Sequence, residues 1–535
     1  MEDSSSDTTP RGAPDDAVGA GGQPQTGPTE RLSWMRLLVL LVVLVLVGAG
    51  IYVGSRHLSS SSPAVDRSWS VPYVDVTLTP TYQFQNPESN PARDIALAFV
   101  VADPKHPCTA SWGGSYTLDT AASELELDRR ITQLRAAGGD VMISFGGQAN
   151  AELALACSDR GKLTTAYRDV ITRYDVKAVD FDIENADISD QASIERRAAA
   201  VATIQKERKA AGHPLDVWLT VPVSTDGMSA EVQALVTATL QGGVELTGVN
   251  VMTMNFGTVA DPITNMLPAT KKALEASAGQ LAAVYSAEGV TLDESQRWAK
   301  LGATPMIGQN DVVGEVFTLD DARGLADFAM SKGLGRVSTW SLNRDGPCGA
   351  SFSDVMVLSN NCSSVEQKAL EYAGVFTVLP GRTPSLPQGQ QVTVTEPPLV
   401  VDNPTTSPYP IWRPDGQYPG GYKVVSQGKV YEAKWYTQGS QPGMLVANPW
   451  DSPWALVGPV SPDDQPFTPS TVAEGTHPDW SPTELYAKGD KVLFDGLPYE
   501  ARWPNQGEAP SSLFPVGPNS AWQPLFTLPG EPTGS

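Results

Sequence analysis

Ala178-Val-Asp180-Phe-Asp182-Ile-Glu184 is a short apolar run that carries three carboxylates at alternate positions. In an extended strand successive side chains point to opposite faces, so the acids share one face and the apolar side chains share the other. Like charges on one face raise each other's pKa and are costly to bury, so folding alone gives no reason to keep them. An exposed edge strand with a solvated acidic face is the simpler interpretation. The wholly apolar opposite face favours a different one, in which a proton donor works beside a charge-stabilising carboxylate.

On both sides of this run, between residues 71 and 379, short β-rich runs alternate with helical stretches, as in βα units around a parallel sheet. The expected helices include Glu124–Ala137, Ser193–Ala211 and Leu319–Lys332. The expected strands are Tyr73–Leu78, Ile95–Val101, Val141–Phe145, Ala178–Ile183, Val217–Val221, Gly248–Met254, Thr304–Gly308 and Arg336–Ser341. This alternation predicts an α/β fold, a (β/α)8 TIM barrel, with its active site at the carboxyl ends of the strands.

Four motifs in chain order resemble family 18 of the glycoside hydrolases, the chitinase family. Asp180-Phe-Asp182-Ile-Glu184 matches the family signature D-x-D-x-E, and Ser144-Phe-Gly146-Gly147 matches S-x-G-G. Downstream, the segments 304–311 and 338–345 look like the last two barrel-strand segments of bacterial members. The resemblance covers about 300 residues, a usual length for one such barrel.

The resemblance implies a retaining hydrolysis in which the N-acetyl oxygen of the sugar replaces an enzyme nucleophile. It makes Glu184 the acid that protonates the glycosidic oxygen and later activates water. Asp182 would orient the acetamido group, and Asp180 would help to hold a proton between the two aspartates. No metal and no other cofactor is required. The implied substrate-binding residues are Ser144, Gly146, Gly147, Met252, Asn255, Phe256 and Trp340.

The segment 251–257 departs from the related bacterial members, which read M-T-M-D-Y-G there. Asn255 replaces an aspartate and Phe256 a tyrosine, so a charge and a hydroxyl near the acetamido group are lost. Asn255 can still donate and accept hydrogen bonds, but Phe256 cannot. The expectation is a slow enzyme or one with a changed sugar preference.

A repeat follows a Pro/Thr-rich linker at residues 380–407. Aromatic residues and glycines from Trp412 to Trp454 recur from Trp480 to Trp522 at one offset, since 480 − 412 = 68 and 522 − 454 = 68. This predicts two copies of a small β fold, module 1 at 408–460 and module 2 at 476–527, with a linker at 461–475 and a tail at 528–535. Both resemble the chitin- and cellulose-binding modules of carbohydrate-binding families 5 and 12.

Exposed aromatic rings are the expected sugar contacts of these modules. Trp435 and Tyr436 are adjacent, and neighbours on a strand face opposite ways, so at least one should be exposed. A flat exposed ring stacks well on a pyranose. Trp503 is the counterpart of Trp435, but Pro504 takes the place of Tyr436, so module 2 is expected to bind more weakly or to act as a spacer.

The composition and the N-terminal region suggest where the chain works. Its 37 Lys and Arg against 60 Asp and Glu give a net charge of −23, which disfavours nucleic acid as a partner. Residues 1–35 have a disordered composition and 55–70 form a linker. Residues 37–54 are apolar and uncharged, so 36–54 are expected to form a transmembrane signal-anchor. Arg31 and Arg36 on one side against Arg56 on the other favour a cytoplasmic N-terminus and an extracellular catalytic domain. The alternative is a cleaved signal peptide and a secreted protein.

The four cysteines, Cys108, Cys157, Cys348 and Cys362, all follow the apolar stretch and fit no C-x2-C metal pattern. An even number beyond a membrane favours two disulfides. The short loop between Cys348 and Cys362 is the natural pair, which leaves Cys108 with Cys157. Reduced buried thiols are the alternative.

Two classes of function remain at this stage. The first is a membrane-anchored extracellular chitinase-like hydrolase that cleaves β-1,4-linked N-acetylglucosamine polymers. The second is a weak or inactive surface lectin that binds chitin or another glycan. The intact Asp180, Asp182 and Glu184 favour the hydrolase, because lectin-like members of the family commonly lose the terminal glutamate.

Overall fold

The structure is a computed structural model that describes residues 70–258, 260–349, 358–377, 401–444, 452–469, 471–511, 514–516 and 519–532. The predicted tail 1–35, the span 36–54, all but Ser70 of the linker 55–70 and most of the linker 380–407 lie outside these residues. Within the described residues, no helix has the length and apolar character that a membrane crossing requires.

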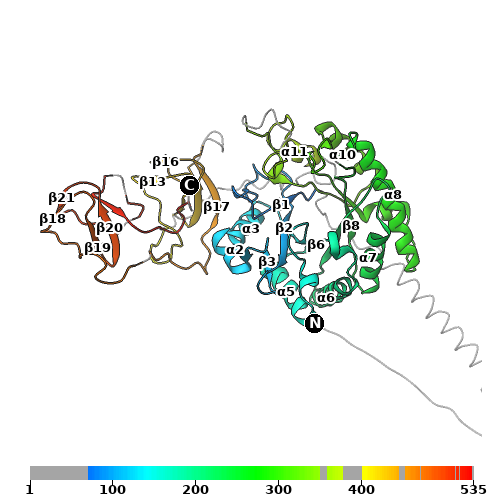
Figure 1. The fold of residues 1–535 in the computed structure, drawn as a ribbon, viewed down its shortest axis with the longest axis horizontal. Helices are drawn as coiled ribbons and strands as arrows, with labels where there is room; N and C mark the ends of the chain where they lie inside the picture. The colour runs from blue at the N-terminus through cyan, green and yellow to red at the C-terminus, as the bar shows by residue number, and fades with distance from the viewer. Residues whose placement is uncertain are drawn as a thin grey trace, which may run out of the picture. The chain divides into compact units, whose positions relative to one another are not determined.

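Parallel strands form a closed barrel with helices around it (Figure 1). The pairing order is β12-β9-β8-β7-β6-β5-β2, with β1 beside β2. The barrel closes where Ser70 bridges Val337 and the Tyr73 amide donates to the Thr339 carbonyl at 3.0 Å. The barrel strands are β1 (Tyr73–Asp75), β2 (Ile95–Ala102), β5 (Val141–Gly146), β6 (Ala178–Asp182), β7 (Asp216–Pro222), β8 (Gly248–Met252), β9 (Leu301–Thr304) and β12 (Arg336–Val337). This confirms the predicted TIM-barrel-like α/β fold.

The seventh predicted strand was misplaced. Thr304–Gly308 was expected, whereas β9 ends at Thr304, where the chain runs into Pro305. Proline has no N–H to donate to a ladder, so regular pairing stops there. Beyond it only a bridge between Met306 and Trp340 continues the sheet.

The helices begin and end at sequence signals. α10 (Leu319–Lys332) starts with a capping box of Thr318 and Asp321 and ends at Gly333, whose φ of 69° is left-handed. α6 (Gln191–Ala210) starts at Asp190, whose side chain accepts from the Ser193 amide. The other described α-helices are α2 (Leu118–Glu124), α3 (Leu127–Ala136), α4 (Leu153–Ala156), α5 (Arg160–Arg173), α7 (Ala230–Gln241), α8 (Met266–Ala287), α9 (Glu294–Ala299) and α11 (Glu371–Thr377). The short 3-10 helices are η1 (Asn185–Ile188) and η2 (Leu342–Arg344), and the short extra strands are β3 (Ala110–Trp112), β4 (Tyr116–Thr117), β10 (Gly308–Gln309) and β11 (Val316–Phe317).

The two faces of the barrel strands pack differently. On β6 the side chains of Val179 and Phe181 point outward and are buried in the main apolar cluster, which also contains residues of the surrounding helices. The alternate residue Asp180 faces a buried polar interior that also contains Asn250 and Arg336. Burial of the apolar face fixes the register of β6, and the same alternation places its acids inside the barrel.

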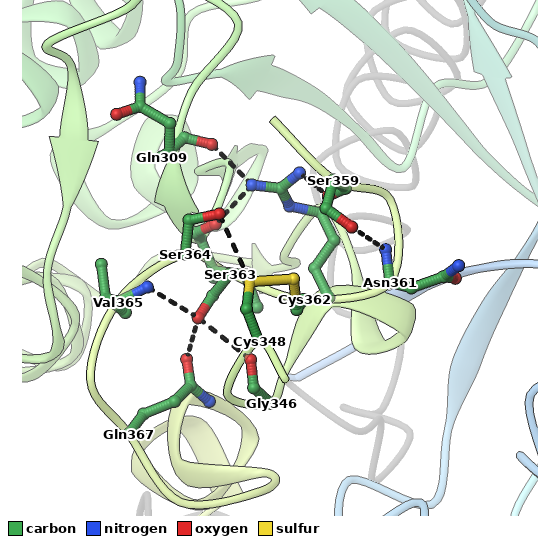
Figure 2. Close-up of a disulfide and its surroundings, with 12 residues drawn as sticks. Gln309, Gly346, Cys348, Ser359, Asn361, Cys362, Ser363, Ser364, Val365 and Gln367 are labelled. Atoms are coloured by element: carbon green, nitrogen blue, oxygen red, sulfur yellow. Dashed lines mark hydrogen bonds between the residues drawn. A yellow bond between two sulfur atoms is a disulfide. The ribbon is translucent and has the colours of Figure 1, made fainter. Parts of the chain in front are cut away.

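Both predicted disulfides are present. Cys108 pairs with Cys157, and Cys348 pairs with Cys362. Figure 2 shows the second pair beside Ser363, whose hydroxyl donates to the Gly346 carbonyl at 3.2 Å. It ties the segment after β12 to the chain ahead of α11.

Modules 1 and 2 have the same strand plan. In each, a two-stranded and a three-stranded antiparallel sheet pack around buried aromatics, Tyr418 and Trp454 in module 1 and Tyr486 and Trp522 in module 2. Their strands keep the repeat offset, since 485 − 417 = 68 and 522 − 454 = 68. The strands are β13 (Gln417–Tyr418), β14 (Lys423–Ser426), β15 (Lys429–Ala433), β16 (Thr437–Gln438), β17 (Trp454–Pro459), β18 (Leu485–Tyr486), β19 (Lys491–Phe494), β20 (Leu497–Ala501), β21 (Asn505–Gln506) and β22 (Trp522–Pro524).

Two details of the modules differ from expectation. Trp435 and Tyr436 lie in the bend between β15 and β16 instead of on a strand, so the alternation rule does not apply, and both are exposed, at 47% and 58%. Leu528, which was assigned to the tail, packs in the core of module 2.

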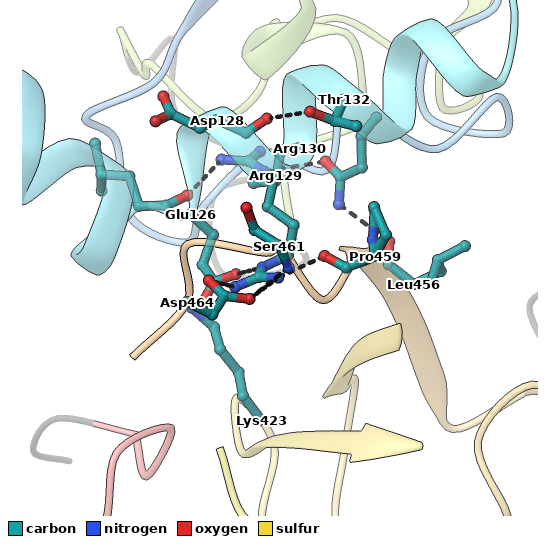
Figure 3. A network of polar contacts seen from close by, with 12 residues as sticks. Glu126, Asp128, Arg129, Arg130, Thr132, Lys423, Leu456, Pro459, Ser461 and Asp464 are labelled. Atoms are coloured by element: carbon teal, nitrogen blue, oxygen red, sulfur yellow. Dashed lines mark hydrogen bonds and ion pairs between the residues drawn. The ribbon is translucent and has the colours of Figure 1, made fainter. Parts of the chain in front are cut away.

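Polar contacts join module 1 to α3 (Figure 3). Arg129 donates two hydrogen bonds to the Asp464 carboxylate, at 2.8 and 2.9 Å, and also contacts Glu126 and the Pro459 carbonyl. Gln85 donates to the Leu456 carbonyl at 3.3 Å. Asp464, in the segment predicted as a linker, is therefore an anchoring residue.

Candidate active site

The three acids lie at the carboxyl end of β6. Asp180 and Asp182 are the third and last residues of the strand, and Glu184 follows it directly before η1. The Ile183 amide still donates to the Thr220 carbonyl of β7 at 2.9 Å, so the chain stays extended up to Glu184. The strand–turn junction therefore holds all three carboxylates where a TIM barrel forms its site.

Asp180 is fully buried and saturated with hydrogen bonds. Its Oδ1 accepts from Thr220 at 2.6 Å and from Arg336 at 2.9 Å. Its Oδ2 accepts from Ser144 at 2.7 Å and from Tyr73 at 2.8 Å. Four donors, one of them cationic, compensate a buried carboxylate well.

Asp182 and Glu184 both have raised pKa values. Burial, followed by the charges of Glu184 and Asp180, raises the pKa of Asp182 well above its usual range, and its Oδ1 has no hydrogen-bond partner. Burial and then the charge of Asp311 raise the pKa of Glu184 to about 7. A glutamate with this pKa is largely protonated at mildly acidic pH and can give up its proton near neutrality.

Gly146 and Gly147 allow the backbone of β5 to approach the acids. Both have positive φ, 98° and 86°, and the Gly147 amide donates to the Asp182 carbonyl at 2.9 Å. A Cβ on Gly146 would lie 2.1 Å from that carbonyl oxygen, and one on Gly147 would lie 2.8 Å from the Phe99 ring. Only glycine fits at either position.

Asn255 bonds to the loop that carries Asp311. Its Nδ2 donates to Asp311 Oδ2 at 2.7 Å, and its Oδ1 accepts from the Asp311 amide at 3.0 Å. The next two amides, of Phe256 and Gly257, donate to the buried carboxylate of Glu315, at 2.9 and 2.6 Å. The side-chain amide of Asn255 thus donates a hydrogen bond to a carboxylate. An aspartate at this position has no N–H and would lose that hydrogen bond.

Trp340 forms an aromatic cluster with Phe99 and Tyr73. Its ring stacks on Phe99, with centroids 5.4 Å apart, and lies 6.0 Å from the ring of Tyr73. Since Phe99 also contacts Gly147, the two predicted segments around residues 146 and 340 meet. Met252 ends β8 and is buried, and Phe256 packs against the main apolar cluster.

Five residues that bond Asp180 or the loop at residues 255–257 were not predicted from the sequence. They are Tyr73, Thr220, Arg336, Asp311 and Glu315. Asp311 stands in a segment already matched to the family, so its charge was a usable signal. The others are polar residues on or beside strands, and only closure of the barrel brings them together.

The predicted sugar contacts of the modules lie outside the barrel. Trp435, Tyr436 and Trp503 are all exposed large hydrophobic residues, the last at 37%. Pro504, beside Trp503, is exposed as well. Among the described residues, module 1 therefore presents two adjacent exposed rings and module 2 one.

No family model matches the chain. Over 285 residues it is 36% identical to the probable bifunctional chitinase/lysozyme of Escherichia coli (strain K12), which covers 53% of this chain and 31% of that protein. Over 281 residues it is 37% identical to endochitinase 11 of Metarhizium anisopliae, covering 52% of each. The chain thus spans about half or less of the length of these relatives.

Solved structures agree with these relatives. The catalytic domain of a hyperthermophilic chitinase from Pyrococcus furiosus matches with a TM-score of 0.50 and 26% identity, over 58% of this chain and 93% of that one. This structural similarity is a second indication of a chitinase-like barrel, beside the D-x-D-x-E acids on β6 and the adjacent S-x-G-G backbone. Over its barrel the chain is therefore similar to chitinases, which are glycoside hydrolases, as its family 18-like motifs predicted.

Proposed function

We propose that the barrel hydrolyses β-1,4-linked N-acetylglucosamine polymers by a retaining, substrate-assisted mechanism. One observation carries the proposal: Glu184, whose pKa is raised to about 7, lies two residues from the buried Asp182 at the carboxyl end of β6. The relatives whose names specify chitinase activity support the choice of substrate.

In the proposed reaction the acetamido oxygen of the bound sugar attacks its own anomeric carbon while Glu184 protonates the leaving oxygen. The glycosidic bond breaks and a cyclic oxazolinium ion forms. Asp182 accepts a hydrogen bond from the acetamido N–H and so stabilises the positive charge. Water then attacks the anomeric carbon, and Glu184 takes back a proton as the ring opens.

The proposal extends to both modules. Trp435 and Tyr436 would stack on the pyranose faces of chitin and hold the enzyme on its polymer, while Trp503 would make a weaker contact. The exposure of these rings in otherwise well-packed small domains supports this role. Replacing Trp435 and Tyr436 together by alanine should reduce binding to insoluble chitin without changing the turnover of soluble chitotetraose.

We further propose that residues 36–54 hold the enzyme on the outer face of the cell membrane, with the N-terminus in the cytoplasm. The two disulfides support an oxidising compartment. Protease added to intact cells should then remove the catalytic domain, and the mature protein should retain residues 1–35. A secreted protein beginning near Ser59 would instead indicate a cleaved signal peptide.

A surface lectin that binds glycan without cleaving it is the second candidate. Two features favour it. The exposed rings of both modules would bind glycan whether or not the barrel is active, and the missing hydroxyl at Phe256 would weaken catalysis. The two candidates differ in one measurable quantity, the release of shorter oligosaccharides.

The test is product analysis on chitotetraose and on insoluble chitin with wild type and Glu184→Gln. The variant should lose a factor on the order of 10²–10⁴ in rate and keep its oligosaccharide affinity. Glu124→Gln, a change at an exposed glutamate on α2, is the matched control and should retain full activity. If the wild type releases no product from acidic to mildly basic pH yet binds both substrates, the lectin is the correct interpretation.

A further inference from the structure

Arg336 is a buried cation in the interior of the barrel. It begins β12, is 1% exposed and lies between the rings of Tyr73 and Trp218, with its guanidinium carbon 5.3 and 5.6 Å from their centroids. One terminal nitrogen donates to Asp180 Oδ1 at 2.9 Å, and Nε donates to the Ser338 hydroxyl at 2.7 Å. Its aromatic and hydroxyl neighbours allow it little freedom to turn away from Asp180.

Asp180 is correspondingly unavailable to Asp182. Each of its oxygens already accepts two hydrogen bonds, from Arg336 and Thr220 on one side and from Tyr73 and Ser144 on the other. Among the described residues, no hydrogen bond joins the two aspartates. A carboxylate oxygen with two donors, one of them cationic, is a poor acceptor for a further proton.

The charged groups around the acids are few. Asp180 faces Arg336 and the neutral hydroxyl of Tyr73. Asp182 faces Glu184, Asp180 and Arg336. Glu184 faces Asp182 and Asp311. The guanidinium therefore bonds Asp180 directly, and its charge lowers the pKa of Asp182.

We propose that Arg336 is a positioning residue for the hydrolysis: it fixes Asp180 as a permanent carboxylate and thereby confines the working proton to Asp182 and Glu184. Asp180 then serves as an electrostatic anchor behind Asp182, outside the path of the proton. The kinetic consequence rests on the proposed chitinase activity, but the protonation states do not.

The first experiment therefore needs no turnover. Infrared difference spectra are taken in a Glu184→Gln background, which removes the glutamate's own carboxylic-acid band. With Arg336 present, Asp182→Asn should remove a carboxylic-acid band at mildly acidic pH, and Asp180→Asn should remove none. After Arg336→Met, Asp180→Asn should remove intensity too. A band lost on Asp180→Asn while Arg336 is present would overturn the proposal.

The second experiment is the pH dependence of kcat/KM on chitotetraose. Arg336→Met should move the acidic limb upward by about one pH unit, since the guanidinium charge that lowers the pKa of Asp182 is then lost, and should leave the basic limb in place. Arg336→Lys, which keeps the charge, should show less than half of that shift. Arg130→Lys, at a buried arginine of α3 that bonds Gln85, controls for general damage and should leave both limbs unchanged.

The outcomes separate the two proposals. A merely structural Arg336 would lower activity equally at every pH without moving the acidic limb, and that result would overturn its positioning role. A wild type without hydrolytic activity would refute the proposed function, while the infrared spectra would still decide the state of Asp180. Should Arg336→Met not fold, Arg336→Gln, which also removes the charge but keeps a hydrogen-bond donor, provides the decision with the same spectra.

Discussion

At Glu184 two physical effects act in the same direction. Burial removes water from the carboxyl group, and Asp311 adds a nearby negative charge, so both favour the neutral acid and raise its pKa to about 7. A general acid must be protonated to work, so activity should fall as pH rises through this pKa. The basic limb of the pH–rate profile therefore reports the surroundings of one residue.

Asp311→Asn tests this contribution at the residue scale. The change removes the negative charge but keeps an oxygen that can accept from Asn255. The pKa of Glu184 should fall, so the basic limb of kcat/KM should move to lower pH by on the order of one unit. Asp327→Asn, at an exposed aspartate on α10, should leave the limb unmoved. An unchanged profile in Asp311→Asn would mean that burial alone sets this pKa.

At the scale of elements, the loop after β8 is hydrogen-bonded to the segment between β10 and β11. Asn255 has a φ of 52° and its side chain donates a hydrogen bond to Asp311. The Glu315 carboxylate accepts hydrogen bonds from the backbone amides of Phe256, Gly257 and Ile263. Buried hydrogen bonds to a charged group are each worth about 1.5–3 kcal/mol. The substitutions at positions 255 and 256 therefore belong to a network that spans two loops.

Asn255→Asp should accordingly reduce activity, although the related bacterial members carry aspartate there. The new carboxylate would lose the hydrogen bond donated to Asp311 and stand against its negative charge. It should also raise the pKa of Glu184 and move the basic limb upward. Asn255→Asp combined with Asp311→Asn should recover much of the loss, because one carboxylate remains. Faster turnover by the single variant would contradict this account of the loop.

How far the sequence predicts these elements depends on the range of the contacts. The alternation in 178–184 places β6 and its acids correctly, because burial of one strand face is a local pattern. Contacts made by barrel closure are not local: Tyr73 and Arg336 reach Asp180 across 107 and 156 residues of sequence. β9 was misplaced because an apolar run does not reveal that Pro305 ends its pairing. At least one of Trp435 and Tyr436 was expected to be exposed because neighbouring residues on a strand face opposite ways. Both are exposed, but they lie in a bend, where that rule does not apply.

At the scale of the whole molecule, module 1 is attached to the barrel through specific contacts. The side chains of Arg129 and Asp464 are only 9% and 16% exposed, and they form two hydrogen bonds. A bidentate pair with little solvent is stronger than a surface ion pair. Module 1 is therefore linked to the barrel by side-chain hydrogen bonds as well as by the connecting chain.

A double-mutant cycle with Arg129→Met and Asp464→Asn measures this link. The coupling free energy from thermal unfolding should be about 1.5–3 kcal/mol. The pair Arg413 and Asp415 within module 1 is more exposed, at 28% and 58%, and should couple by no more than about 1 kcal/mol. Equal coupling for the two pairs would indicate that the Arg129 contact does not hold module 1 in solution.

If Glu184 drives a retaining hydrolysis assisted by the sugar itself, the anomeric form of the first product shows it most directly. Proton NMR of chitotetraose during its first minutes with the enzyme distinguishes α from β reducing ends before they equilibrate. Two inversions at the anomeric carbon, first by the acetamido oxygen and then by water, should give the β-anomer. Initial formation of the α-anomer would contradict the account.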